Sequence, residues 1–186
     1  FNGPVRVQAG LLGARLGGTN DLFVAPEAVF DALGQRATVG DLTGSGLLTN
    51  GVIAVTDRLD AGTNGAPAGA RMTVQNLALT RGFTFACDWT KDPLGRITND
   101  LVAVTEDLSV EGAGFVDFGR TEANAISVPF STTIMSYGKS ATGTFSGWKP
   151  LNTGLSEGKH TVLVVTADSG YVNIEVRYSG LLVLIK

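Results

Sequence analysis

The chain has 186 residues, of which 44% are hydrophobic and 17% are charged, a composition that indicates a packed globular protein and excludes a disordered chain. Its formal net charge of -3 comes without any run of Lys or Arg, so we expect no nucleic-acid partner. The longest apolar stretches, such as residues 181–185, are far shorter than the roughly 18 residues of a spanning helix, so we expect no membrane insertion.

Residues 1–50 are predicted to form a connecting region that contains one short helix over residues 26–33. Pro26 stands at a first-turn position, Glu27 follows near the positive end of the helix dipole, and Gly34 ends the pattern. The apolar residues that would share one face of this helix are Val29, Phe30 and Leu33. A second, weaker helical pattern covers residues 38–42.

From residue 51 to residue 186 the pattern is β throughout, and the boundary between the two regions falls in the Gly-rich residues 40–51. The 25 glycines recur between short apolar alternations, as expected for many strands joined by turns, which favours a sandwich or barrel. Residues 161–166 and 172–178 are rich in β-branched residues and flank a turn sequence at 167–170, so we expect a hairpin there.

Few residues could carry chemistry, and we predict no enzyme activity and no cofactor. His160 is the only histidine, so a His-based metal centre would need carboxylates for its remaining ligands. Cys87 is the only cysteine, which excludes a Cys-rich zinc site and a disulfide within the chain. Cys87 lies in an alternating strand pattern and is expected to be buried. The segments 44–46 and 112–114 lack the remaining features of nucleotide loops and are expected to be turns.

Carboxylate pairs are the remaining candidates for catalysis or metal binding. They occur at Asp57/Asp60, Asp88/Asp92 and Glu106/Asp107, and solvated loop acids explain them better than a sugar-cleaving pair. None matches a calcium loop, so no metal site is predicted, although residues 57–64 could present a few oxygen ligands to a hard cation.

Aromatic residues in polar, turn-like segments are the candidate ligand-binding residues. A Trp or Tyr ring beside hydrogen-bonding groups can serve as a platform for a sugar, but the same ring can instead be a buried plug at the end of the fold. The candidate residues are Trp89, Tyr137, Trp148, Asp88 and Lys91.

The segment Gly17-Gly18-Thr19-Asn20-Asp21, followed by Val24-Ala25-Pro26, resembles a short motif of tailed-bacteriophage tail-fibre proteins. The resemblance covers residues 7–33. Asn20 and Ala25 stand where the motif has Asp and Thr. The closing residues 157–185 are similar to the last strands of jelly-roll heads.

The resemblance implies an N-terminal trimerisation connector and, over residues 51–186, a jelly-roll-like antiparallel β-sandwich head. It further implies a homotrimer on the surface of a virion, in contact with other virion proteins and with a host surface receptor, either glycan or protein. The apolar residues predicted to lie in the trimer interface, because the connector offers them little core, are Leu11, Leu12, Leu16, Val29, Phe30 and Leu33.

Two alternatives to a receptor-binding fibre stay open. One is a capsid decoration or head-fibre protein that stabilises the shell and binds no receptor. The other is a glycan depolymerase, which we rank last because the sequence shows no repeat of the parallel-helix type.

Overall fold

The computed structural model describes residues 3–18, 20–62, 68–91, 93–120, 124–155 and 161–179. The protein is mainly β, with 64% strand, and the described residues form no helix. It follows that no helix in these ranges is long and apolar enough to cross a membrane. The strands are β1 (Val5–Val7), β2 (Leu11–Gly13), β3 (Leu22–Val24), β4 (Val29–Gly44), β5 (Leu47–Ala61), β6 (Arg71–Leu79), β7 (Thr84–Ala86), β8 (Trp89–Lys91), β9 (Ile97–Asn99), β10 (Leu101–Val104), β11 (Leu108–Val110), β12 (Phe115–Arg120), β13 (Phe130–Tyr137), β14 (Ala141–Gly143), β15 (Lys149–Thr153), β16 (Thr161–Asp168) and β17 (Tyr171–Tyr178).

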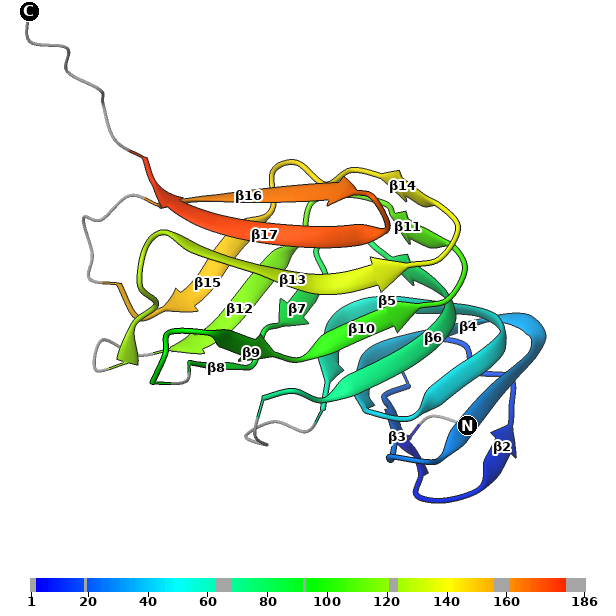
Figure 1. The fold of residues 1–186 in the computed structure, drawn as a ribbon. Helices are drawn as coiled ribbons and strands as arrows, with labels where there is room; N and C mark the ends of the chain where they lie inside the picture. Colours follow the sequence, from blue (N-terminus) through cyan, green and yellow to red (C-terminus); the bar gives the residue numbers. More distant parts are fainter. Residues whose placement is uncertain are drawn as a thin grey trace, which may run out of the picture.

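The strands wind into a parallel β-helix with three walls (Figure 1). Wall A stacks β2, the starts of β4, β5 and β6, then β10 and β13. Wall B stacks the middles of β4 and β5, the end of β6, then β11 and β14. Wall C stacks β3, the ends of β4 and β5, then β7, β12 and β15. Every pairing within these walls is parallel, so each coil lies directly on the coil before it.

Inward-pointing side chains form ladders along the coil axis, because parallel pairing in register places equivalent residues above one another. On wall C the ladder consists of Leu22, Leu42, Leu59, Phe85 and Val116, all with 0% exposure. Wall B contributes a second ladder of Val39, Val55, Leu79 and Val110. Burying each of these side chains stabilises the fold by roughly 1.5–3 kcal/mol.

The corner between wall C and wall A brings neighbouring coils into close contact at Gly44. Its φ of 110° is one that residues with a side chain rarely adopt. A Cβ atom there would lie 2.1 Å from the carbonyl oxygen of Val24. Gly44 also exchanges two backbone hydrogen bonds with Gly62 of the next coil (2.7 and 2.9 Å). The predicted turn at residues 44–46 is therefore confirmed, and its glycine permits the coils to stack.

An antiparallel hairpin of β16 and β17 follows the last coil and confirms the hairpin predicted from the sequence. Ser169 and Gly170 form its turn, both with positive φ, as two-residue hairpin turns require. Strand β17 pairs with β13 in antiparallel orientation, so the hairpin continues wall A beyond the last coil (Figure 1).

The predicted helix over residues 26–33 is wrong. Pro26 and Glu27 form a turn, and the Ala28 N–H donates to the Ala25 carbonyl oxygen (3.1 Å). Glu27 has φ of 64°, which no α-helix contains. The apolar residues after the turn belong to β4, as do residues 38–42, because pairing with β2, β3 and β5 outweighs the local helical pattern.

The sequence predicted an antiparallel sandwich of the jelly-roll type, whereas most strands of the structure pair in parallel. Sheets do enclose a common core, as they would in a sandwich. Among the described strands, however, antiparallel pairing is limited to β8 with β9, β13 with β17 and β16 with β17. The predicted boundary at residues 40–51 falls where β4 passes into β5, and these strands pair with each other and share one core.

Replacing Leu59 by Ala should lower the free energy of unfolding by about 2–5 kcal/mol, because it opens a cavity in the middle of the wall C ladder. Urea unfolding followed by circular dichroism measures the change. The matched control is Leu94→Ala, since Leu94 is 79% exposed and its truncation should cost little. Equal stability of both variants would contradict the assignment of the ladder as core.

Candidate functional site

Three aspartates gather beside the corner that leads from wall C to wall A. One carboxylate oxygen from each of Asp60, Asp88 and Asp100 lies within 4.8 Å of the other two. Asp60 and Asp100 are each only 1% exposed, whereas Asp88 is half-buried. We call these three residues the acidic cluster.

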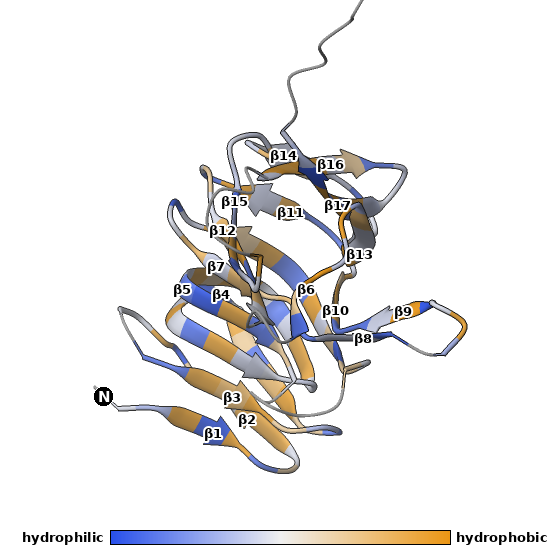
Figure 2. Cartoon of the chain, turned by 90° about the vertical axis from the view of Figure 1, so that its left-hand side faces the viewer, coloured by the Kyte–Doolittle hydropathy of each residue, from blue (hydrophilic) through white to orange (hydrophobic). Residues whose placement is uncertain are grey.

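The coil brings the acidic cluster together from three places in the sequence. Asp60 lies near the end of β5, where alternation directs Leu59 into the core and Asp60 to the opposite side of the wall. Asp88 follows β7, and Asp100 precedes β10. The hairpin of β8 and β9 lies between them and projects from the stacked coils (Figure 2). The Asp100 N–H donates to the Asp88 carbonyl oxygen (3.0 Å) and closes the base of this hairpin.

The carboxylate of Asp100 is held rigidly by the backbone. Its Oδ1 accepts hydrogen bonds from the N–H groups of Gly69 (2.6 Å) and Ala70 (2.7 Å). A Cβ atom on Gly62 would lie 3.0 Å from its Oδ2, so the chain packs closely around this carboxylate.

Arg58 is the basic residue that the structure places against the cluster. Its Nη2 lies 3.6 Å from Asp60 Oδ2, and its Nη1 lies 3.2 Å from Asp117 Oδ2, so its charge is shared between two carboxylates. Burial raises the pKa of Asp60, and the charges of Asp88 and Asp100 add to this rise against the opposing effect of Arg58. Burial also raises the pKa of Asp100, opposed by the N–H groups of Ala70 and Gly69. The surroundings of Asp60 and Asp100 therefore stabilise the charged carboxylates less well than water does.

The chemistry of the acidic cluster fits a cation better than a sugar. Carboxylates that cleave a glycosidic bond must face a substrate, but two of these three are almost completely buried. Carboxylate oxygens are, in contrast, the preferred ligands of hard cations such as calcium. Residues 57–64 were recognised in the sequence as a source of oxygen ligands, and the structure brings Asp60 of this segment into the cluster. Asp57 is exposed and lies outside it.

Asp100 was not selected from the sequence as a candidate site residue. In the sequence, Asp88 was paired with Asp92 as a neighbouring carboxylate, and Asp92 lies outside the described residues. The signal for Asp100 is its position directly before the buried strand β10. Only the coil places that strand start next to Asp60 and Asp88. Of the third predicted pair, Glu106 forms a salt bridge with Lys139 (3.1 Å), and Asp107 accepts a hydrogen bond from Ser140 (2.7 Å).

The two tryptophans predicted as ligand platforms are buried in this structure, as the alternative plug interpretation describes. Trp89 is 9% exposed and packs on Phe130, with ring centroids 4.9 Å apart. Trp148 is 3% exposed and makes an edge contact with Phe83 (4.8 Å). Its indole N–H donates to the Thr144 carbonyl oxygen (3.1 Å).

The other predicted ligand residues do not gather in one place. Tyr137 is half-buried in β13 and packs against the core, whereas Lys91 is exposed at the end of β8. Asp88 belongs to the acidic cluster. Cys87 is fully buried, as predicted. His160 lies outside the described residues.

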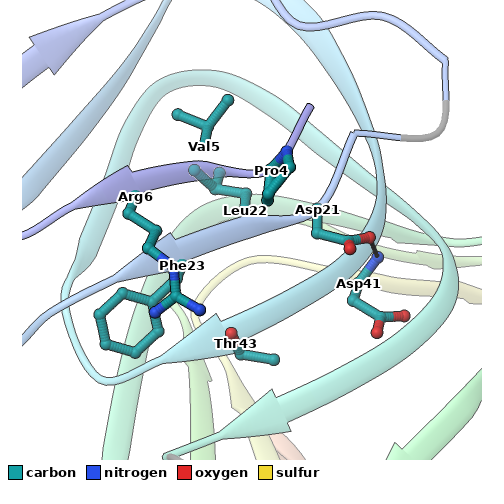
Figure 3. A pocket seen from close by; sticks show the side chains of 8 residues that line it. All are labelled: Pro4, Val5, Arg6, Asp21, Leu22, Phe23, Asp41 and Thr43. Atoms are coloured by element: carbon teal, nitrogen blue, oxygen red, sulfur yellow. Dashed lines mark hydrogen bonds between the residues drawn. The ribbon is translucent and has the colours of Figure 1, made fainter. Parts of the chain in front are cut away.

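A small hollow on the outer side of wall C lies near the N-terminal end of the coil (Figure 3). The Arg6 guanidinium stands 5.5 Å from the centre of the Phe23 ring. Asp21 Oδ1 accepts a hydrogen bond from the backbone N–H of Asp41 (3.2 Å). Burial raises the pKa of Asp41, as do the charges of Asp21 and Asp57. Arg6 is already engaged by the Phe23 ring and Asp21 by a backbone N–H group, so the hollow offers little for a ligand.

Comparison with known proteins gives no relative: no family model, no curated protein and no solved structure matches the chain.

Replacing Trp148 by Ala should lower the free energy of unfolding by about 3–5 kcal/mol, because the ring is buried against two phenylalanines. Thermal melting measures this loss. The matched control is Tyr178→Ala, since Tyr178 is 51% exposed and should melt like the wild type. An unchanged melting temperature for Trp148→Ala would instead favour a ring available to a ligand.

Asp117 should stabilise the fold at neutral pH and lose this effect in acid. Burial alone would raise the pKa of Asp117, but hydrogen bonds from Asn152, Gly119 and Arg58 hold it below its ordinary value. A lowered pKa in the folded state means stabilisation above the unfolded-state value of about 3.9, lost as the pH falls through the folded-state pKa.

The variant Asp117→Asn should therefore be less stable than the wild type by about 1 kcal/mol at pH 7. Urea unfolding as a function of pH should show the two proteins converging as the pH falls through the folded-state pKa of Asp117. The exposed control Asp168→Asn should follow the wild type throughout. A difference that is constant across the pH range would show that the charge of Asp117 is not its cause.

Proposed function

We propose that the chain is a structural component of a virion fibre or spike, located at the particle surface. It assembles as a homotrimer, contacts other virion proteins and binds a host surface receptor, preferentially a glycan. The support comes from the resemblance of residues 7–33 to a tail-fibre connector motif and from an exposed apolar stripe on the same part of the fold.

The apolar stripe carries the proposal. Leu11, Val29 and Leu47 stand next to one another in register on three successive coils of wall A. Leu11 is 69% exposed, Leu47 is 40% exposed, and Val29 is half-buried. The stripe borders a shallow hollow whose lining also includes polar residues: Glu27, Ala28, Val29, Ser45, Gly46, Leu47 and Thr73. Aliphatic side chains aligned on the outside of a coil are typical of an interface.

The predicted trimer residues divide into two groups in this structure. Phe30 (0% exposed) and Leu16 (8%) are buried within the chain itself and have no surface to offer a second copy. Leu12 packs against the core. Leu11, Val29 and Leu33, which is 47% exposed, retain surface. The trimer proposal therefore rests on these three residues together with Leu47.

Support for receptor binding comes from the hairpin at the other end of the coil. The outer side of this region has a hollow lined mainly by hydroxyl, amide and charged groups, among them Ser131, Thr166, Asn173 and Arg177. Tyr171 lies on the same strand as Asn173 and Arg177, at the same alternation, and is 52% exposed. Polar groups beside an exposed ring suit the recognition of a sugar.

A glycan depolymerase is the second candidate, because the parallel β-helix removes the reason for ranking it last. Two of the three carboxylates that gather in the acidic cluster are, however, almost completely buried. Host polysaccharide incubated with the protein should therefore keep its chain length. A capsid decoration protein differs from both candidates in binding no host surface.

The double variant Leu11→Ser/Leu47→Ser should convert the trimer to monomer, because it removes most of the exposed apolar stripe. Light scattering at micromolar concentration measures the mass, and circular dichroism checks that the fold is kept. The control Leu94→Ser changes an exposed leucine outside the stripe and should stay trimeric. A monomeric wild type would overturn the trimer proposal.

Host adsorption tests the second half of the proposal. Tyr171→Ala and Arg177→Ala should each lower the affinity for host cells, up to about thirtyfold for a residue that anchors the interface, and leave thermal melting unchanged. Full adsorption by both variants would remove the hairpin from the receptor site. Failure of the wild type to adsorb would favour the decoration protein.

A further inference from the structure

We infer that the acidic cluster of Asp60, Asp88 and Asp100 is a structural calcium site that fixes the β8–β9 hairpin to the coil. It is independent of the proposed virion function.

The spacing of the carboxylate oxygens suits a calcium ion. Calcium binds oxygen at about 2.3–2.6 Å, so two oxygens on the same ion are separated by at most about 4.6–5.2 Å. One carboxylate oxygen from each aspartate lies within 4.8 Å of the others, so all three can bind one calcium ion with little movement. Magnesium binds at about 2.0–2.1 Å and requires oxygens closer than about 4.2 Å in near-octahedral geometry. Because 4.8/√3 is about 2.8, a point within about 2.8 Å of all three oxygens exists, which is nearer to the calcium distance than to the magnesium distance.

One carboxylate oxygen of Asp60 has no hydrogen-bond partner among the described residues. Asp60 Oδ1 is fully buried and accepts no hydrogen bond from the described part of the chain. The other oxygen of Asp60 has only Arg58, at 3.6 Å. A buried carboxylate oxygen without a partner costs free energy, and such atoms in folded proteins normally have a hydrogen-bond donor or a cation. Asp60 Oδ1 therefore lacks the donor or cation that a buried carboxylate oxygen normally has, and the described residues do not supply one.

The charge around the cluster also favours a bound cation. Three carboxylates meet at a site where Arg58 is the basic side chain in contact, and Arg58 also pairs with Asp117. Like charges at this separation repel each other strongly where water is largely excluded. One divalent cation would neutralise the excess and bind three segments at once: the end of β5, the residue before β8 and the residue before β10.

Calcium titration of the full chain tests the inference. Protein treated with chelator and then desalted should melt about 5–10 °C higher in calcium at a hundred times the dissociation constant. Magnesium should give a smaller shift. Isothermal titration calorimetry should give one calcium ion per chain. A wild type without a calcium-dependent shift or binding heat would overturn the site and assign the cluster to carboxyls that share a proton.

Asn variants separate the cluster from other acidic groups. Asp60→Asn keeps the shape of the side chain and removes its charge, so it should weaken calcium binding by about tenfold or more and, at the same calcium concentration, reduce the melting shift to about half or less. The matched control Asp57→Asn lies three positions away, outside the cluster, and should respond like the wild type. If Asp60→Asn fails to fold, Asp88→Asn serves instead, since Asp88 is half-buried. Equal calcium responses in the cluster variant and the control would overturn the site.

Discussion

Parallel pairing between successive coils is the constraint on which the rest of this structure depends. A single coil of about 20–30 residues has no second layer of its own, so it can satisfy its backbone hydrogen bonds and bury its apolar side chains only against neighbouring coils. The ladder from Leu22 to Val116 shows the result, because each member covers the next across five coils. Stability is consequently shared along the axis rather than concentrated in one layer.

The same stacking produces the features from which we argue function. Residues that point outward are aligned by the register that aligns the core, so Leu11, Val29 and Leu47 become one apolar stripe although the chain separates them widely. Corners are stacked as well. The start and end of the β8–β9 hairpin meet the end of β5 there, and three acidic side chains converge where the chain turns from wall C to wall A. An interface and an ion site are thus both products of the coil register.

The degree of burial decides whether the acidic cluster, the tryptophans and the outer faces can meet a large partner. The acidic cluster is covered, so it can hold an ion and cannot readily meet a polymeric substrate. The tryptophans, which the sequence places in polar segments, are covered too, and their rings pack on phenylalanines of the core. The outer sides of wall A and of the terminal hairpin remain exposed, which is why assembly and recognition are proposed there.

The sequence by itself determined that the chain is mainly β, that Cys87 is buried and that residues 161–178 form a hairpin. These are local properties: alternation, β-branched density and a turn between two strands decide them. It did not determine that most strands pair in parallel, because pairing direction depends on which distant segments meet, and coils of unequal length hide the repeat. The turn at Pro26 resembled a helix start because the local sequence carries no information on distant pairing. The residues after it form strand β4 only through their contact with β2 and β5. Asp100 joined Asp60 and Asp88 through the tertiary structure alone, because three residues far apart in the chain become neighbours only when the coils stack.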